Sequence, residues 1–294
     1  MKLKNFIFLL LLAFTIVNAS SQLLYKIEGN GLQNPSYIFG THHLAPISII
    51  EKTGAADYFK ETQQVVGEID MTVDPMTLAM QMQKHMMAPA DSVLSKLISD
   101  EDFEIINEEF KKYSPMQGLD LNSLQMLKPA ALLAMVEVGI MQELIPDYDQ
   151  ENQLDTYFQK IGKEQGKTII PLEDAEFQAK TLFDFTPISV QAEMLVELLK
   201  NPEKSREMAI ALNEAYEKGD LESMLFLDDE KDEADEEFEK ILVNNRNADW
   251  LTKLPAIINN GSTFIAVGAL HLVGDNGIIQ GLRNMGYTVN PIQK

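Results

Sequence analysis

The sequence contains no cysteine, and this absence removes several kinds of chemistry at once. Disulfide bridges, zinc–thiolate sites, thiol nucleophiles and a lipid on an N-terminal cysteine are all excluded. Any reaction must therefore use histidine, carboxylate, arginine, lysine, tyrosine or hydroxyl groups. Histidine is scarce too, since the 294 residues include only His42, His43, His85 and His271. The positions of these four residues are therefore informative.

Positive charge is also in short supply. The chain has 45 acidic and 24 basic side chains, which gives a formal net charge of -21. A surface this negative repels phosphate backbones, so we expect no nucleic-acid partner. It supports solubility and favours cationic partners. Hydrophobic residues make up 45% of the chain, which is enough for a packed core and argues against global disorder.

Long apolar runs are confined to the beginning of the chain. Lys2 and Lys4 precede an apolar stretch over residues 6–17, and Ala19 offers a small residue at a cleavage site. This stretch is shorter than the roughly 20 residues of an ordinary membrane helix. We expect a cleaved signal peptide over residues 1–19 and a periplasmic or secreted protein that meets the membrane only during export. An uncleaved N-terminal anchor is the alternative.

The rest of the chain alternates between strand and helix patterns. The β-prone runs are 23–27, 36–39, 64–69, 167–172, 263–267 and 287–291. The first two flank the turn residues Gly29-Asn30-Gly31 and predict a hairpin. The stretch of about 74–260 is mostly helical and is interrupted by the strand near 167–172. We therefore predict one α/β domain over residues 20–294 with a largely helical insertion.

Two Gly-x-x-His segments are the sharpest local signal. Gly40 precedes His43, and Gly268 precedes His271, each at the end of a β-prone run. Open α/β sheets bind their ligands at the carboxyl ends of strands, and glycine permits a sharp exit from a strand. We expect the two imidazoles to share one cavity. The alternative is two unrelated histidines that cap strands.

Two carboxylates end other predicted strands. Glu68 and Glu173 could join His43 and His271 at one rim, in a two-histidine, carboxylate array suited to zinc, manganese, cobalt or iron. Such a metal would activate water and polarise a carbonyl. Taken alone, each glutamate could equally be an exposed charge at a strand end.

Three further features lie in the helical part. Arg246 could clamp a site carboxylate or bind an oxyanion, or it could form a purely structural ion pair. The methionines of 76–87 suit a flexible lid over the crevice, and His85, within that segment, is not expected to act. A serine-nucleophile elbow, a phosphate loop and an HExxH motif do not occur in the sequence.

Several blocks together resemble the TraB/GumN family from about residue 23 to 291. They are LYKIEGNGLQNPSYIFGTHHL, QVVGEID, LDTYF, GKTIIPLED, RNADW and FIAVGALHLVGDNGIIQGLRNMGYTV. That family is similar to the TIKI metalloproteases and, more distantly, to ChaN and erythromycin-esterase-like proteins. The resemblance implies an α/β fold with a central sheet built from two related halves. It also implies a site with His43, His271, Glu68 and Arg246.

Two functions are compatible with these residues. The leading hypothesis is a metal-dependent hydrolase of peptides or proteins, because TIKI relatives are manganese- or cobalt-dependent peptidases. His43 and His271 would bind the metal, Glu68 would be a ligand or general base, and Arg246 a clamp. The alternative is a non-catalytic protein that sequesters a peptide or a metal or haem compound.

Overall fold

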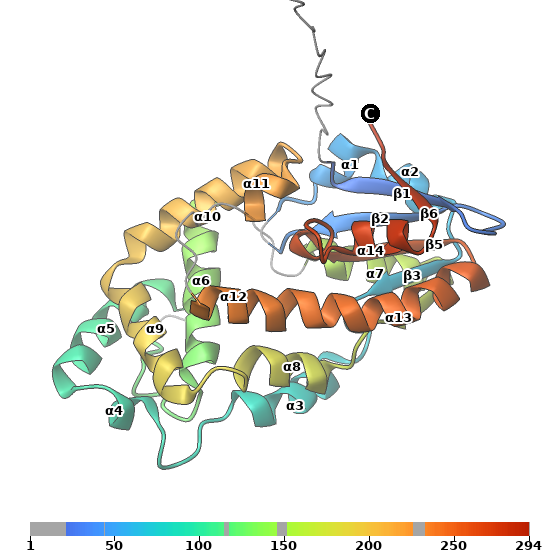
Figure 1. The fold of residues 1–294 in the computed structure, drawn as a ribbon. Helices are drawn as coiled ribbons and strands as arrows, with labels where there is room; N and C mark the ends of the chain where they lie inside the picture. The colour runs from blue at the N-terminus through green and yellow to red at the C-terminus, as the bar shows by residue number, and fades with distance from the viewer. Residues whose placement is uncertain (1–21, 44, 115–117, 146–151, 226–232, 294) are drawn as a thin grey trace, which may run out of the picture.

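A computed structural model describes residues 22–43, 45–114, 118–145, 152–225 and 233–293 (Figure 1). The predicted signal peptide lies outside these residues. Within the described part of the chain, no helix is both long and apolar enough to cross a membrane.

The core of the fold is a six-stranded sheet with the order β4-β3-β5-β2-β1-β6. Its strands are β1 (Leu24–Gly29), β2 (Ser36–Thr41), β3 (Gln64–Gly67), β4 (Thr168–Pro171), β5 (Thr263–Gly268) and β6 (Tyr287–Pro291). Neighbours among β4, β3, β5 and β2 pair in parallel. Strands β1 and β6 extend the sheet in antiparallel pairing. The six predicted strands are confirmed, and none of their ends shifts by more than two residues.

The predicted hairpin is confirmed by the pairing of β1 with β2. Leu24 faces Phe39 and Ile27 faces Ser36 across the two strands. Gly29, Asn30 and Gly31 have φ angles of 79°, 46° and 84°. Glycine and asparagine tolerate this left-handed region, so these turn residues suit the chain reversal.

Helices account for most of the chain between β3 and β5. Before β4 they are α3 (Pro75–Met86), α4 (Leu94–Leu97), α5 (Asp100–Tyr113), α6 (Pro129–Leu144) and α7 (Leu154–Glu164). After β4 come α8 (Ala175–Phe183), α9 (Ile188–Lys200), α10 (Pro202–Glu217), α11 (Leu221–Leu225), α12 (Glu233–Glu239) and α13 (Asn245–Asn260). The short helices α1 (Ile49–Thr53) and α2 (Ala55–Lys60) join β2 to β3, and α14 (Ile278–Asn284) precedes β6. The α/β class is thus confirmed, whereas the relation between two halves stays a prediction.

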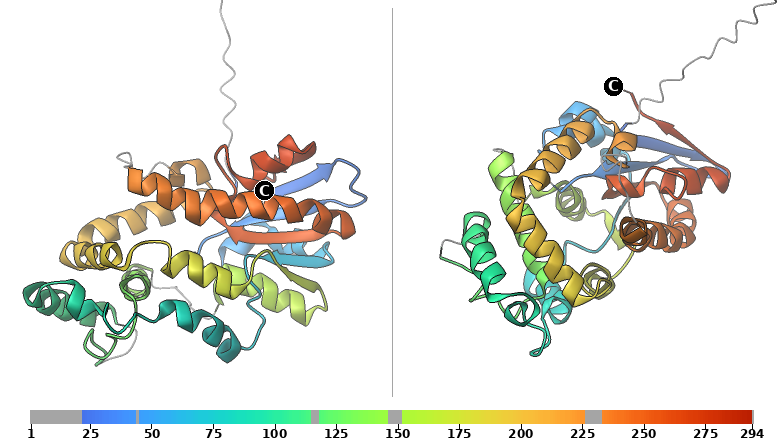
Figure 2. Two further views of the ribbon diagram at one scale, coloured as in Figure 1. Left: turned by 60° about the horizontal axis from the view of Figure 1, so that its bottom comes forward. Right: turned by 60° about the vertical axis from the view of Figure 1, so that its left-hand side comes forward.

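The described residues form two main hydrophobic cores. One surrounds the sheet and contains Trp250, Phe158 and Phe264, all fully buried. The other lies between α5, α6 and α9 and contains Phe110 and Leu195. In Figures 1 and 2 these three helices and α10 stand to one side of the sheet. The helical part therefore has its own packed core beside the sheet.

The parallel strands place the predicted site residues at one edge. β2, β5, β3 and β4 are neighbours that all end at this edge. Directly beyond their ends come His43, His271, Glu68 and Glu173. The expectation that the two Gly-x-x-His segments leave the same edge of a shared sheet is confirmed.

Candidate functional site

Arg246 on α13 joins the two carboxylates at this edge. Its Nη2 donates to Glu68 Oε2 at 2.6 Å and to Glu173 Oε1 at 2.7 Å, and its Nε donates to Glu173 Oε2 at 3.1 Å. The Arg246 and Glu173 side chains are only 7% and 3% exposed. The pair with Glu173 is two-pronged, a geometry for which the flat guanidinium is suited.

The remaining N–H groups of Arg246 are also occupied. Nη1 donates to the carbonyl oxygen of Leu242 at 2.9 Å and lies 3.1 Å from His271 Nε2. A guanidinium has five N–H donors, and all five have a protein partner here. Of the two predicted roles, this arrangement is that of a carboxylate clamp, since no N–H group is left for an external oxyanion.

The start of α13 presents the side chains of Arg246, Asn247 and Trp250 to the site. A π-helical turn, η2 (Lys240–Asn244), leads directly into the helix and carries the Leu242 carbonyl that Arg246 reaches. Such turns are frequent at functional sites. One turn after Arg246, Trp250 donates from Nε1 to Glu173 Oε2 at 3.2 Å, and its ring lies 4.7 Å from the guanidinium carbon. The aromatic face thus stabilises the buried cation.

Asn247 determines the tautomer of His271. Its Nδ2 donates to the carbonyl oxygens of His271 and Asn276, so its Oδ1 is the atom that faces His271 Nδ1, at 2.7 Å. His271 Nδ1 must therefore carry the proton and donate it. Burial lowers the pKa of His271 to about 4, so the ring is neutral at pH 7. The free lone pair of Nε2 then accepts from Arg246.

Glu68 is an ionised acid in this network. Burial works to raise its pKa, but the neighbouring His271, Arg246 and Gly268 N–H lower it to about 2. The Gly268 N–H donates to Glu68 Oε1 at 2.9 Å, and Gln178 Nε2 donates to Oε2 at 3.0 Å. The side chain is 17% exposed, so Glu68 keeps some access to solvent. For Glu173, by contrast, burial dominates and raises the pKa.

His43 lies apart from this network and pairs with Asp155. Its Nδ1 is 2.8 Å from Asp155 Oδ2, and its side chain is 65% exposed. The Asp155 carboxylate raises the pKa of His43 to about 9, so the imidazole is protonated at pH 7. Glu68 also acts on this pKa, which places the two groups within electrostatic range of each other. Strands β2 and β3 flank β5, so their ends are separated by two strand spacings, about 10 Å.

Asp155 is the main residue that the sequence reasoning missed. It lies in the first turn of α7, its two carboxylate oxygens are buried, and no other described group donates a hydrogen bond to them. Buried polar atoms with so few partners are uncommon in folded proteins, and a catalytic role is one of the explanations for them. The only sequence signal was its place in the LDTYF block, which carries no mechanism by itself.

His42 makes a different set of contacts from His43, although both side chains line the same cavity. Its ring packs on Tyr216 with 5.2 Å between centroids, and Tyr216 donates to the Gly40 carbonyl at 2.8 Å. Burial lowers the pKa of His42 to about 4. His42 is therefore a neutral, largely packed ring beside the site.

A cavity of about 600 Å³ opens beside His43. His42 and His43 form one end of it, and the other walls come from α6, α9 and α10. The predicted lid, 76–87, lies in α3, which contributes no lining residue and packs on α8 instead. Helices of the predicted helical middle thus line the cavity, but the 76–87 segment is not among them.

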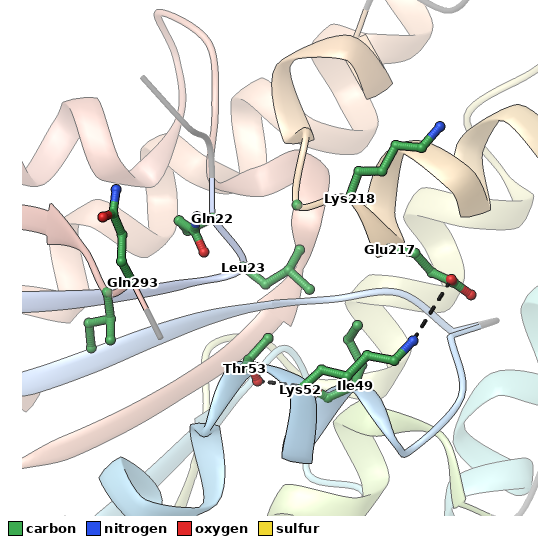
Figure 3. A pocket seen from close by; sticks show the side chains of 10 residues that line it. Gln22, Leu23, Ile49, Lys52, Thr53, Glu217, Lys218 and Gln293 are labelled. Atoms are coloured by element: carbon green, nitrogen blue, oxygen red, sulfur yellow. Dashed lines mark hydrogen bonds and ion pairs between the residues drawn. The ribbon is translucent and has the colours of Figure 1, made fainter. Parts of the chain in front are cut away.

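A second cavity, of about 490 Å³, lies where β1 begins (Figure 3). Lys52 and Glu217 approach to 3.9 Å across it, and Gln22 and Gln293 line the opposite side. No predicted site residue lines this cavity. The cavity at His43 is therefore the candidate functional cavity.

The glycines of the Gly-x-x-His segments have a different role from the one predicted. Neither Gly40 nor Gly268 has a positive φ, so a sharp exit from the strand is not the reason for glycine. A Cβ on Gly40 would lie 3.1 Å from the Ala269 Cα, and one on Gly268 would lie 3.2 Å from Glu68 Oε1. Close approach of the next turn and of the site carboxylate accounts for both glycines.

The predicted metal set does not form a coordination sphere as these residues stand. Neutral His271 and the Glu68 carboxylate have suitable donor atoms. However, both oxygens of Glu173, one oxygen of Glu68 and Nε2 of His271 face Arg246. Among the described residues, no three His, Asp or Glu side chains form a group that could hold a metal. Binding of manganese, cobalt or zinc stays a prediction.

The two neutral histidines make stability sensitive to mild acid. In the unfolded chain a histidine takes up a proton near pH 6.5, whereas folded His42 and His271 remain neutral down to about 4. The unfolded state binds more protons in this range, so the free energy of unfolding should fall as pH drops from 6.5 to 4. Each residue contributes up to about 3 kcal/mol.

Urea unfolding at pH 7 and pH 5 checks this expectation. His42→Gln should lose part of the pH dependence because it removes one of the two groups. Equal pH dependence in His42→Gln and the wild type would contradict the assignment of His42 as a neutral, largely packed ring.

The fold and the edge site define an α/β protein with a clamped carboxylate network and an adjoining cavity. The model of the TraB/PrgY/gumN family matches residues 23–291, which is nearly the whole chain. The chain belongs to this family, and the predicted family resemblance is confirmed. No curated protein and no solved structure matches the chain.

Proposed function

We propose that this protein is a hydrolase whose substrate is a peptide or protein and whose reaction takes place between His43 and Glu68. One observation carries the proposal. An exposed, protonated histidine held by a buried aspartate stands at the end of a large cavity, across one strand from an ionised glutamate. Acid and base groups whose environments move their pKa values apart are a mark of acid–base catalysis.

The two groups suit the two proton transfers of amide hydrolysis. Glu68 takes a proton from a water molecule as the water oxygen attacks the carbonyl carbon. His43 gives its Nε2 proton to the leaving nitrogen as the carbon–nitrogen bond breaks. Asp155 holds Nδ1 and stabilises the imidazolium, as a carboxylate partner does in serine hydrolases. Glu68, whose pKa is about 2, then releases the proton it took to solvent, and His43 regains its proton from solvent, to which it is open.

Arg246 and its partners position the base. The guanidinium and the Gly268 N–H hold the two oxygens of Glu68, while Asn247 and Trp250 hold His271 and Glu173. Such supporting contacts keep a reactive group within tenths of an ångström of its working position.

A divalent metal is kept as a separate proposal with its own test. Manganese, cobalt or zinc on His271 and Glu68 would require Arg246 to leave Nε2 of His271. Elemental analysis of the purified protein measures occupancy. Activity lost on chelation and restored by one of these ions would support metal dependence, whereas full activity in a metal-free preparation would overturn it.

The size of the cavity also supports a second candidate function. About 600 Å³ is enough to hold a drug-sized ligand, so the protein could sequester a peptide or a metal or haem compound without turnover. Incubation with a peptide library separates the two functions. New peptide termini that accumulate beyond one per protein support the hydrolase, and intact peptide that co-elutes at a fixed ratio supports sequestration.

We also propose that the protein is exported. The proposal is supported by the charged and apolar features of residues 1–19 in the sequence. N-terminal sequencing of protein from the cell envelope should give a chain that starts near Ser20. A retained Met1 would contradict the cleaved signal peptide.

A further inference from the structure

The walls of the cavity beside His43 are predominantly apolar. Leu133 and Met141 come from α6, Met194 from α9, and Met208 and Leu212 from α10. Methionine side chains are flexible and adapt to ligands of different shape. The histidines lie at one end only, so a bound molecule has an apolar environment along most of its length.

Glu137 is a charged exception within this apolar lining. It lies on α6, its side chain is exposed to the cavity, and no described group forms a hydrogen bond or ion pair with it. Burial beside the cavity raises the pKa of this carboxyl to about 7, and a cation bound next to it would favour the ionised form. Glu197 and Lys204 line the cavity as well, both exposed. The lining therefore carries two acidic groups and one basic group, apart from the histidines.

We propose that this cavity is a recognition site for an apolar group that ends in a cation, such as a hydrophobic peptide segment with a lysine or a free amine. The apolar walls bind the hydrophobic part, and the Glu137 carboxylate pairs with the ammonium. This proposal names the class of substrate that the proposed hydrolase would bind. It rests on the proposed function only for the reaction at His43.

Charge distinguishes this occupant from other apolar ligands. A fatty acid would bring a third carboxylate into a lining that already has Glu137 and Glu197 against Lys204, and the charge of His43 is already balanced by Asp155. Like charges in an apolar site repel strongly. A neutral hydrocarbon would leave the Glu137 carboxylate without a partner. The net charge of -21 attracts cations from solution and repels anions, which favours the same ligand.

Three probes of equal chain length test the proposal. Octylamine, octanol and octanoate are titrated separately into the full chain by calorimetry. The same titrations are repeated with His43→Asn, which lacks the proposed catalytic acid. Octylamine should bind about tenfold more tightly than octanol, and octanoate should bind weakest. In Glu137→Gln the advantage of octylamine over octanol should disappear, while octanol binding stays the same.

Two further variants test whether the probes bind in this cavity. Ala134→Trp, which fills the cavity from α6, should remove binding of all three probes, with its circular dichroism spectrum as the check on folding. Glu193→Gln, on α9 but outside the lining, should behave like the wild type. Equal binding of octylamine and octanol, or an octylamine advantage that survives Glu137→Gln, would overturn the proposal.

The same titrations distinguish this inference from the proposed function. Selective octylamine binding without peptide cleavage would support the recognition site and reject the hydrolase. Peptide cleavage without such selectivity would support the hydrolase and reject the recognition site.

Discussion

His43→Asn should lower kcat for peptide cleavage by about 10²–10⁴-fold, because it removes the group that protonates the leaving nitrogen. The fold should be unaffected, since the His43 side chain is 65% exposed and, among the described residues, makes its one polar contact with Asp155. The measurement is steady-state kinetics on a peptide that the wild type cleaves, with a thermal melt of each variant.

His85→Asn is the matched control for this variant. His85 lies on α3 and does not line the cavity, so its loss should leave kcat within about twofold of the wild type. Wild-type activity in His43→Asn would show that His43 is not the acid.

Asp155→Asn should change the pH dependence of kcat. With Asp155 ionised the pKa of His43 is raised to about 9, so the acid form and the activity persist up to that pH. The neutral amide should let the pKa fall toward its usual value, about 6.5. The alkaline limit of kcat should therefore move to lower pH, and an unchanged limit would separate Asp155 from His43.

Arg246→Met should lower the free energy of unfolding by about 3–5 kcal/mol, the usual cost of removing one partner from a buried ion pair. The change leaves Glu68 and Glu173 without the guanidinium that balances their negative charge, and the Glu173 side chain is only 3% exposed. The free energy of unfolding of Arg246→Lys should lie between those of the wild type and Arg246→Met, because an ammonium keeps the charge but cannot match both carboxylates. Urea unfolding at pH 7 measures all three proteins.

A second substitution tests whether buried charge causes this loss. Glu173→Gln added to Arg246→Met removes one of the two uncompensated carboxylates and should recover part of the stability. Lys218→Met, which removes the exposed ion pair with Glu214, should have little effect. A loss below about 1 kcal/mol in Arg246→Met would contradict the clamp described here.

Much of the edge site follows from sequence patterns because parallel strands end together. The run before His271 and the run before Glu68 both have the apolar character of buried strands, and their order around the sheet leaves little freedom in where the next residues lie. Arg246 could be connected to these carboxylates because it lies on the helix that precedes the strand before His271, but the pattern alone also allowed a purely structural ion pair. The prediction that His43, His271, Glu68, Glu173 and Arg246 serve one site thus rested on strand-end patterns and on the family resemblance.

The rest of the site depends on packing that no local pattern records. Asp155 meets His43 because α7 packs against the sheet, and the sequence near Asp155 shows only the start of a helix. The cavity walls come from the second core, where the choice of α6, α9 and α10 over α3 depends on long-range contacts. Likewise, the glycines allow a close approach, which becomes visible only when Ala269 and Glu68 are in place.

The most direct test of the central claim is a peptide-library digest in oxygen-18-labelled water. Mass spectrometry of the products shows whether a water oxygen enters a new C-terminus, which is the defining event of hydrolysis. We predict that the wild type yields labelled C-termini in excess over protein and that His43→Asn and Asp155→Asn yield far fewer. Peptides recovered intact and unlabelled, bound at a fixed ratio to the protein, would contradict the hydrolase.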